Sequence, residues 1–300
     1  MSSDESPGTG TTSEATDAFV GHRNLLFTVA YEMLGSAADA EDVLQEAWLR
    51  WAEVDHADVR DRRAYLVRIT TRLSLNRMRT TARRRESYVG PWLPEPLLTA
   101  PDVAEDVELA DSVSTAMLLV LETLTPTERA VFVLREVFAV EYDEIAAAVD
   151  KSPAAVRQIA HRARSHVEAR RPRESVTPTE RDAVIARFLT ATATGDLQGL
   201  MDVLAPDVVL LTDGGGFKKA ALRPIHGRDK VLRFLAAVAP ENAEAQVVTI
   251  NGQPALRLLI GGELDAIGTM LVEDGLVTGL YLVRNPHKLG RIDGAVPLTR

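Results

Sequence analysis

The sequence contains no cysteine among its 300 residues, so disulfide bonds and thiolate zinc sites are excluded. This composition fits a cytoplasmic protein, and neither a metal nor a cofactor is expected. Long apolar runs are also missing, so we expect no membrane span. Residues 1–16 lack the cationic and apolar stretches of a signal peptide and are expected to be a disordered tail. The chain length predicts two or three domains.

Charge is distributed in alternating blocks, although the whole chain carries a net charge of −9. Residues 57–90 hold 10 Lys and Arg against 3 acids, and residues 151–173 hold 7 against 1. Acids dominate residues 1–56, with 11 against 2 cations, and residues 91–150, with 13 against 2. This pattern suits a protein that offers cationic patches to phosphates and anionic patches to a basic partner. The alternative is that the acidic blocks only keep a DNA-binding protein in solution.

Residues 141–170 predict two short helices joined by a turn, because two apolar faces follow one another at helical spacing. Ser152 and Pro153 supply an N-cap hydroxyl and a proline at the first position of the second helix. Polar and cationic residues remain on its outer side, which suits a helix laid in the DNA major groove. The candidate DNA-binding residues here are Lys151, Arg157, Gln158, His161, Arg162 and Arg164. The alternative is an ordinary solvated surface helix.

An acidic face is predicted on the helix that follows Ser36. The buried side of this helix carries Leu44, Ala47, Trp48 and Trp51, at positions i, i+3, i+4 and i+7. Its opposite side carries Asp39, Asp42, Gln45 and Glu46. The acids at positions 42 and 46 repel each other across one turn. Such a cluster is usually a solvated face, but it also suits a cationic partner helix.

A long basic helix is predicted over residues 62–85. Four arginines of this helix fall within about 60° of one another around its axis. They are Arg68, Arg72, Arg79 and Arg83. A stripe of like charges is unfavourable unless something anionic lies along it, so this arginine stripe is a second candidate DNA surface. Tyr65 and Trp51 could stack on unpaired bases, although aromatic residues on helices are more often buried.

Residues 86–107 form a predicted linker, because four prolines forbid a continuous helix. Its apolar side chains are too numerous for a free tether, so we expect them to dock on another part of the chain. Helix is expected to resume over residues 108–124. Capping boxes are predicted at residues 125–128 and again at residues 177–180.

The C-terminal part predicts a compact α+β domain, with helices first and a strand meander afterwards. The expected helices cover residues 180–193, 197–204 and 230–238, and the expected strands lie near 208–211, 245–250, 254–260, 264–272 and 277–284. Pro286 cannot donate to a sheet and marks the end of the domain. An enzyme could use Asp213, His226, Asp265 and Tyr281 for proton transfer, but no spacing ties them into one site.

Together these residues resemble the extracytoplasmic-function (ECF) sigma factors of bacterial RNA polymerase, over about residues 17–171. The resemblance implies two all-α domains, sigma region two at residues 17–85 and sigma region four, with its helix-turn-helix, at 108–173. It also implies that core polymerase binds Asp39, Asp42, Gln45 and Glu46. Minus-ten DNA is assigned to the arginine stripe with Asn76 and Arg77, and minus-thirty-five DNA to the second helix of the helix-turn-helix.

One subgroup of this family carries a fused SnoaL-like domain and the motifs WLPEP, DGGGK and NPDKL. This chain has Trp92, Leu93, Pro94, Glu95 and Pro96, then Asp213, Gly214, Gly215 and Gly216, then Asn285, Pro286, His287, Lys288 and Leu289. Phe217 stands where the motif has lysine, and His287 replaces the acid. The resemblance implies an α+β, NTF2-like cone over residues 178–290, followed by a tail at 291–300.

The expected function is that of a sigma factor that binds core RNA polymerase and promoter DNA, is not an enzyme and is regulated by its own SnoaL-like domain. We expect the WLPEP segment to pack against the 213–216 loop and residues 285–289. The alternative is a DNA-binding activator with a ligand-sensing domain, or with an enzymatic domain of the isomerase or cyclase kind. Whether the domain binds a small molecule stays open.

Overall fold

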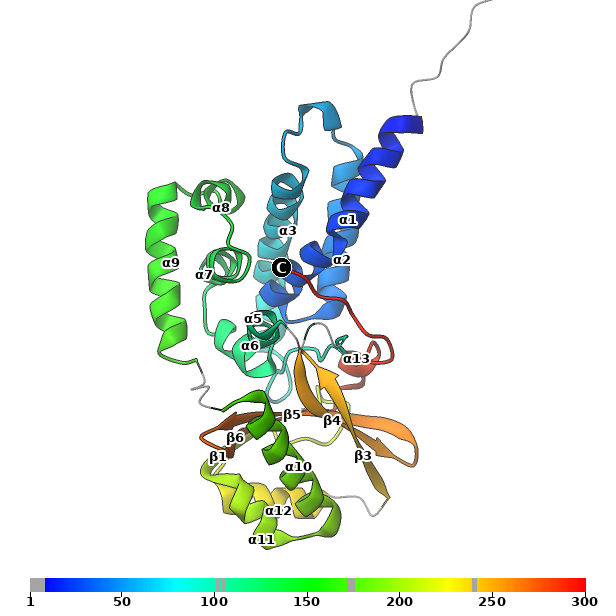
Figure 1. The fold of residues 1–300 in the computed structure, drawn as a ribbon, viewed down its shortest axis with the longest axis vertical. Helices are drawn as coiled ribbons and strands as arrows, with labels where there is room; N and C mark the ends of the chain where they lie inside the picture. The colour runs from blue at the N-terminus through cyan, green and yellow to red at the C-terminus, as the bar shows by residue number, and fades with distance from the viewer. Residues whose placement is uncertain (1–8, 101–102, 104–105, 172–175, 239–241) are drawn as a thin grey trace, which may run out of the picture. The chain divides into compact units, whose positions relative to one another are not determined.

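The chain folds as two units, shown in Figure 1. The computed structural model describes residues 9–100, 103, 106–171, 176–238 and 242–300. The first unit comprises Met1–Ala82, Glu122–Glu168 and Pro297–Arg300. The second unit comprises Arg83–Leu121 and Ala169–Val296.

In the described part of the first unit, the secondary-structure elements are helices. Its elements are α1 (Thr9–Leu34), α2 (Ala37–Ala52), η1 (His56–Asp58), α3 (Arg62–Glu86, which runs past the unit boundary), α7 (Pro126–Phe132), η2 (Val133–Val137), α8 (Tyr142–Val149) and α9 (Pro153–Glu168). Gly35 adopts a positive φ of 65° after α1, where a glycine is unstrained. The Ser36 side chain then accepts the Asp39 N–H at 3.2 Å and caps α2 as predicted.

The core of this unit is built from the apolar faces that the helical spacing predicted. Leu44 and Ala47 of α2 are buried, and α2 packs along α1. Trp51 is fully buried, and its indole N–H donates to the Ala15 carbonyl at 2.8 Å. Trp51 is therefore a core residue, as its place on the buried side of α2 predicts, and the alternative that it stacks on unpaired bases does not hold.

Two boundaries differ from the predictions. Helix α1 begins at Thr9, so residues 9–16 of the expected disordered tail are helical, and residues 1–8 lie outside the described part of the chain. Ala15 is buried, and its carbonyl accepts a hydrogen bond from the Trp51 indole N–H. These contacts attach the extra part of α1 to the core. The single helix expected over 108–124 is two helices, α5 (Val107–Ser112) and α6 (Thr115–Leu121). The Ser114 hydroxyl accepts the Met117 N–H at 3.2 Å and so starts a new helix.

The second unit has the predicted α+β composition. Besides α5 and α6 it contains α10 (Pro178–Thr194), α11 (Leu197–Val203), β1 (Leu204–Asp213), β2 (Ile225–His226), α12 (Arg228–Val238), β3 (Ala243–Ile250), β4 (Gln253–Ile260), β5 (Glu263–Glu273), β6 (Leu276–Val283) and α13 (Pro286–Leu289). The strand order is β2-β1-β6-β5-β4-β3. The β1–β6 pair is parallel and the other pairs are antiparallel. Among the strands of the described part, β2 was not predicted, and neither was the short helix α13.

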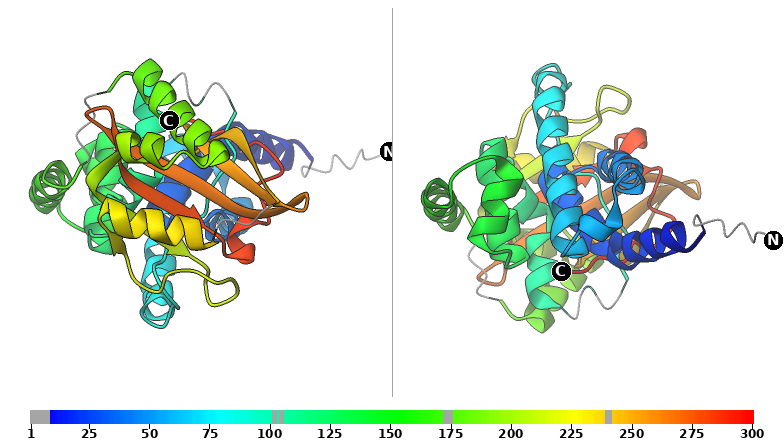
Figure 2. Two further views of the ribbon diagram at one scale, coloured as in Figure 1. Left: turned by 90° about the horizontal axis from the view of Figure 1, so that it is seen from below. Right: turned by 90° about the horizontal axis from the view of Figure 1, so that it is seen from above.

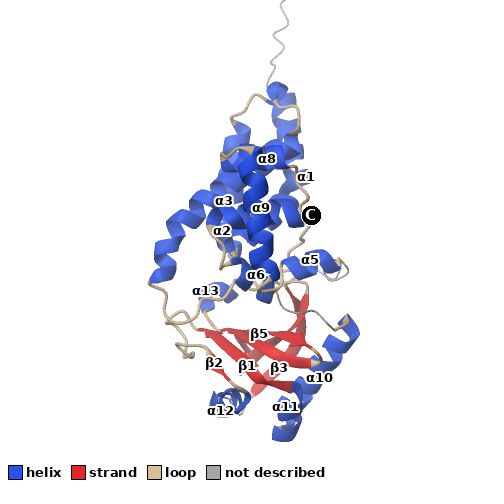
Figure 3. Cartoon of the chain, turned by 90° about the vertical axis from the view of Figure 1, so that its left-hand side faces the viewer, coloured by secondary structure: helices blue, strands red, loops and turns tan. Residues whose placement is uncertain are grey.

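Both faces of this sheet are covered by other parts of the second unit, and the helices on one face can be followed in Figures 2 and 3. Helices α10, α11 and α12 pack on one face, where Phe188 and Val231 meet strand residues such as Leu280. On the other face, Leu93 of the linker packs with Leu289 of α13. The linker also forms an antiparallel bridge between Leu98 and Ile250 of the edge strand β3. The linker thus forms part of the core of the second unit.

The local capping signals are confirmed. Thr125 and Glu128 form a reciprocal capping box at the start of α7. Thr177 and Glu180 do the same at the start of α10. In each case the threonine hydroxyl accepts the N–H three residues later, and the glutamate returns to the threonine N–H.

Candidate functional site

The acidic face of α2 lies at the surface, as its sequence pattern predicts. Asp42, Gln45 and Glu46 are exposed and Asp39 is half-buried. Glu46 forms an i, i+4 ion pair with Arg50 at 2.7 Å. At this exposure such a pair contributes a few tenths of a kcal/mol. The face therefore carries net negative charge on a rigid helix.

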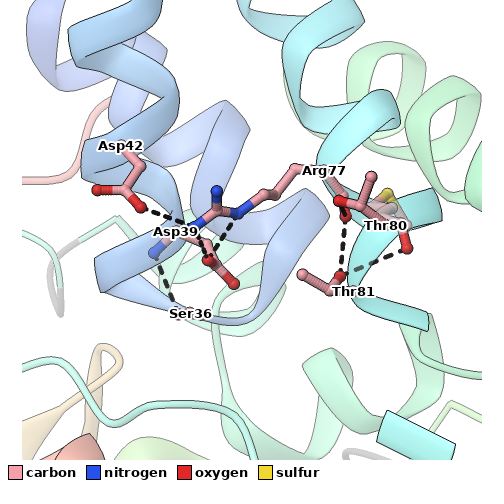
Figure 4. A network of polar contacts seen from close by, with 7 residues as sticks. Ser36, Asp39, Asp42, Arg77, Thr80 and Thr81 are labelled. Atoms are coloured by element: carbon pink, nitrogen blue, oxygen red, sulfur yellow. Dashed lines mark hydrogen bonds and ion pairs between the residues drawn. The ribbon is translucent and has the colours of Figure 1, made fainter. Parts of the chain in front are cut away.

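Arg77 of α3 reaches this acidic face, as Figure 4 shows. Its guanidinium lies 2.5 Å from Asp39 Oδ1 and 2.7 Å from Asp42 Oδ2. Partial burial opposes the charged form, but the hydrogen bond and charge of Asp39, followed by those of Asp42, raise the pKa of Arg77. We expected Arg77 to face minus-ten DNA. Its guanidinium instead joins α3 to the residues expected to bind polymerase.

The arginine stripe occupies several environments along α3. Arg68 lies over the Tyr65 ring, with 4.8 Å between its Cζ and the ring centroid. Arg72 donates to the Ala147 carbonyl at 2.8 Å and to the Ala148 carbonyl at 3.4 Å, near the C-terminal end of α8. Cations there complement the helix dipole. Arg79 and Asn76 are exposed. The side chain of Arg83 lies outside the described part of the structure.

Helices α8 and α9 form the predicted helix-turn-helix. Asp150 closes α8 in the left-handed conformation with φ 56°, and the Ser152 hydroxyl accepts the Ala155 N–H at 3.2 Å to start α9. Most of the predicted DNA-binding residues are exposed, namely Lys151, Arg157, Gln158, His161 and Arg162. Arg164 differs, because it is half-buried and forms a salt bridge with Glu136 at 2.6 Å.

The linker and the C-terminal α+β domain meet at the buried carboxylate of Asp213, at the end of β1. Its Oδ1 accepts from the Tyr88 hydroxyl at 2.6 Å. Its Oδ2 accepts from the Leu93 N–H at 2.9 Å and from Lys288 Nζ at 2.7 Å. The Asn285 amide donates to the Tyr88 hydroxyl at 2.7 Å. All three sequence motifs therefore converge on one group, which we call the Asp213 cluster.

Two glycines make this convergence sterically feasible. A Cβ on Gly214 would lie 2.2 Å from the Lys218 carbonyl oxygen. A Cβ on Gly215, whose φ is +58°, would lie 2.2 Å from the Asn285 amide nitrogen. A side chain at either position would thus displace the loop that carries Asp213.

Most of the remaining motif residues are packed into the cluster or the core beside it. The Trp92 ring lies between two cations, with Arg85 Cζ at 3.9 Å and Lys288 Nζ at 4.1 Å from its centroid. Pro94, Glu95, Pro96 and Leu289 are buried, whereas Pro286 is exposed at the start of α13. The WLPEP segment is thus held by both polar and apolar contacts.

Burial dominates the electrostatics of the Asp213 cluster. Desolvation lowers the pKa of Lys288 to about 8, although the charge of Asp213 and its hydrogen bond oppose this shift. Desolvation, together with the hydrogen bond to Asp213, raises the pKa of Tyr88. The Asp213 cluster therefore joins the linker to the C-terminal domain through charged groups that are costly to bury.

Comparison with known proteins identifies the two helical segments of this chain. Residues 19–84 match Sigma-70 region 2, and residues 114–167 match Sigma-70, region 4. The chain is 37% identical over 286 residues to the ECF RNA polymerase sigma factor SigJ of Mycobacterium tuberculosis, covering 90% of this chain and 91% of the relative. The chain belongs to the ECF RNA polymerase sigma factors. It is therefore a factor for promoter-directed transcription initiation.

The likeness extends through the SnoaL-like domain of this sigma factor. The crystal structure of M. tuberculosis SigJ matches with a TM-score of 0.76 at 33% identity, covering 93% of this chain and 99% of that chain. The probable sigma factor SigI of M. tuberculosis is 32% identical, covering 91% of this chain and 93% of the relative. The expected multi-domain architecture, with two helical sigma regions and a C-terminal α+β domain, is confirmed.

The sequence reasoning missed a fully buried arginine of sigma region four, Arg129 of α7. Its Nε donates to the Glu32 carbonyl of α1 at 2.9 Å, and its Nη1 forms a salt bridge with Glu122. Burial lowers the pKa of Arg129 to about 9, opposed by the charge of Glu32. The signal in the sequence was that Arg129 is a single cation directly before the apolar run Ala130–Leu134. Burial of that run predicts that the residues next to it are also buried. Tyr88 was also missed, and no local pattern marks it.

The C-terminal residues are also ordered parts of the sigma factor, although we had expected a tail. The Val296 N–H donates to the Leu98 carbonyl at 2.8 Å within the second unit. Within the first unit, Leu298 is buried and the Thr299 N–H donates to the Thr28 hydroxyl of α1 at 3.1 Å.

The four residues considered for an enzyme site have separate roles in the second unit. Asp213 is the centre of the cluster, and Asp265 forms salt bridges with Lys218 and Arg284, each at 2.8 Å. His226 is exposed on β2, and burial raises the pKa of Tyr281 on β6 to about 12. Within the described residues, no hydrogen bond joins any two of these four.

One further finding concerns membranes. In the described ranges, none of the helices combines the length and the apolar character needed to cross a bilayer.

Proposed function

We propose that this sigma factor contacts core RNA polymerase through the acidic face of α2 and reads promoter DNA through α3 and α9. The exposure of Asp42, Gln45 and Glu46 supports the first assignment, because charges that remain solvated can be desolvated by a partner. The exposed cations Lys151, Arg157 and Arg162 support the second, since phosphates are neutralised by accessible Lys and Arg. In this role the protein acts in the cytoplasm, together with RNA polymerase.

The SnoaL-like domain acts in this proposal as a built-in regulator and not as an enzyme. The observation that carries this part is the Asp213 cluster, in which the domain holds the linker through a buried carboxylate. The Asp213 carboxylate has about four lone-pair sites, and three of them already accept hydrogen bonds from Tyr88, Leu93 and Lys288. The carboxylate is thereby committed to holding the linker.

Transcription in vitro tests the sigma function. Core polymerase, a library of promoter fragments and the full chain should yield discrete transcripts, whereas core polymerase alone should not. The double reversal of Asp42 and Glu46 to Lys should leave α2 folded by circular dichroism and abolish the pull-down of core polymerase. Retained full affinity would exclude the acidic face as the contact.

A truncation series tests the regulatory part on the same promoter. Removal of residues 180–300 should impair transcription, because the linker loses the surface on which Leu93 and Trp92 pack. Removal of only the residues after Arg284 should raise activity, because Lys288 and its hold on Leu93 are lost while Asp213 remains. Equal transcription by both truncations and the full chain would contradict regulation by this domain and favour an enzymatic role for it.

A further inference from the structure

Three apolar side chains of the second unit remain largely exposed to solvent. Phe217, Leu222 and Val89 have relative exposures of 64%, 69% and 51%, which is unusual for side chains of this size. Two of them follow the DGGG motif and the third belongs to the linker. We call them the Phe217 patch.

These three residues come together through glycine contacts. A Cβ on Gly216 would lie 3.5 Å from Val89, and Gly216 directly precedes Phe217. A Cβ on Gly90 would lie 3.8 Å from the Leu222 side chain. The Phe217 ring stands edge-on to the His287 ring, with 4.5 Å between centroids. The residues of the Phe217 patch thus contact residues next to the Asp213 cluster, and these contacts hold the patch in place.

The segment that carries Phe217 and Leu222 is cationic. Residues 214–226 contain Lys218, Lys219 and Arg223 and no acid. Lys218 forms a salt bridge with Asp265. The exposed Lys219 and Arg223 side chains form no salt bridge with any residue that the structure describes. Unpaired cations beside an apolar surface favour an anionic partner that also has flat apolar faces.

We propose that the Phe217 patch binds unpaired promoter DNA, with a base stacked on Phe217 and phosphates on Lys219 and Arg223. Aromatic stacking combined with flanking cations is the general mode of single-strand binding. This proposal rests on the proposed role of α3 in minus-ten DNA binding and extends it to the SnoaL-like domain.

Chain connectivity places such a strand within reach of the patch. Glu86, at the end of α3, lies seven helical positions after Arg79, which is a rise of about 10 Å. Three more residues lead to Val89, adding at most about 10 Å. Whatever the arrangement of the two units, Val89 therefore lies within about 20 Å of Arg79. An unpaired strand that leaves the arginine stripe can extend to the patch.

The test uses holoenzyme assembled from core polymerase and the full chain, with a promoter selected in vitro. One probe is a fork-junction DNA with an unpaired non-template strand from the minus-ten element, and the other is the same sequence as a full duplex. Phe217→Ala should weaken fork-junction binding by about 5- to 150-fold, the range for loss of one stacked base. Phe217→Trp should retain the affinity, and duplex binding should not change. Leu197→Ala, at a side chain of similar exposure on α11, is the matched control and should have no effect.

The phosphate contacts are tested by salt dependence. Lys219→Ala with Arg223→Ala should lower the log–log slope of fork-junction affinity against salt by about 1.4, at about 0.7 per single-strand phosphate. Unchanged fork-junction affinity in Phe217→Ala would overturn the proposal. A loss of core polymerase affinity would also overturn it, since the patch would then be a protein contact. If the wild-type holoenzyme itself binds no fork junction and makes no transcript, the proposed function fails instead.

Discussion

Two clusters of cations and carboxylates in this sigma factor differ mainly in burial. In the Asp213 cluster the side chains of Asp213 and Lys288 are 0% and 11% exposed. In the acidic-face cluster the side chains of Arg77, Asp39 and Asp42 are 34%, 24% and 55% exposed. The ion-pair distances are similar, at 2.7 Å in the first and 2.5 and 2.7 Å in the second.

This difference separates a structural joint from an exchangeable contact. A buried pair cannot lose one partner without leaving an uncompensated charge, so it holds the linker in one position. An exposed pair contributes little to stability, because water replaces either partner at low cost. Asp39 and Asp42 can therefore exchange Arg77 for a cation of another protein, while Asp213 cannot exchange Lys288.

The largest effect is expected when the buried pair is broken. Asp213→Asn leaves the Lys288 ammonium buried without its counter-ion and should lower the stability of the second unit by about 3–5 kcal/mol. Hydrogen exchange of the Leu93 amide, which donates to Asp213, reports this loss locally. Adding Lys288→Met removes both charges and should recover at least about 1 kcal/mol of it. Strictly additive losses in the double variant would show that the two charges do not depend on each other.

A smaller effect is expected when the pH is changed, and the pKa of Lys288 determines whether stability rises or falls. The pKa of Lys288 is lowered from 10.5 to about 8, so between these values the unfolded state holds a proton that the folded state lacks. The stability of the wild-type chain relative to Lys288→Met should therefore rise between about pH 8 and pH 10, by at most about 1.4 kcal/mol per pH unit. Urea unfolding at several pH values measures this.

The pH comparison has a built-in control. The lowered pKa of Arg129 has the same sign of effect, but Arg129 is present in both chains and cancels in the difference. The raised pKa of Tyr88 has an effect only near and above its ordinary value of 10.0, at the upper end of the pH window, and Tyr88 is also present in both chains. A relative stability that falls with pH would mean that the attraction of Asp213 outweighs the desolvation of Lys288.

Local features of this chain were predictable, whereas long-range partners were not. Helix periods, the capping boxes at Thr125 and Thr177 and the meander of strands depend on residues a few positions apart. Linker docking was also predictable, because exposed Trp and Leu residues need a covering surface. The break at Ser114 was missed because the helical period continues across it.

The partners of individual polar groups depend on the fold. Tyr88 and Asp213 are 125 positions apart, Arg129 and Glu32 97, and Arg77 and Asp39 38. No local pattern pairs residues at such separations. For that reason the sequence predicted arginines suited to phosphates, but not that Arg77 turns towards α2.

A moderate effect is expected along the arginine stripe. Arg79→Ala should lower the salt slope of promoter binding by about 0.7–0.9, the contribution of one phosphate contact. Arg72→Ala should lower it less, because the Arg72 guanidinium already donates to the carbonyls of Ala147 and Ala148. Filter binding by the holoenzyme over a range of salt concentrations measures both slopes. An unchanged slope in Arg79→Ala would remove this residue from the DNA surface.

The smallest effect on stability is expected at the exposed cluster. Arg77→Ala removes two partly exposed ion pairs and should lower the stability of the first unit by at most about 1 kcal/mol. The salt slope of promoter binding should stay at the wild-type value, since the guanidinium is already paired with Asp39 and Asp42. Thermal unfolding and the filter-binding series used for Arg79→Ala measure the two quantities. If the slope falls as far as it does in Arg79→Ala, Arg77 leaves the acidic face in the promoter complex. In that case Arg77 exchanges its two aspartates for a DNA phosphate. The contact of Arg77 with minus-ten DNA that the sequence predicts would then form when the holoenzyme binds the promoter.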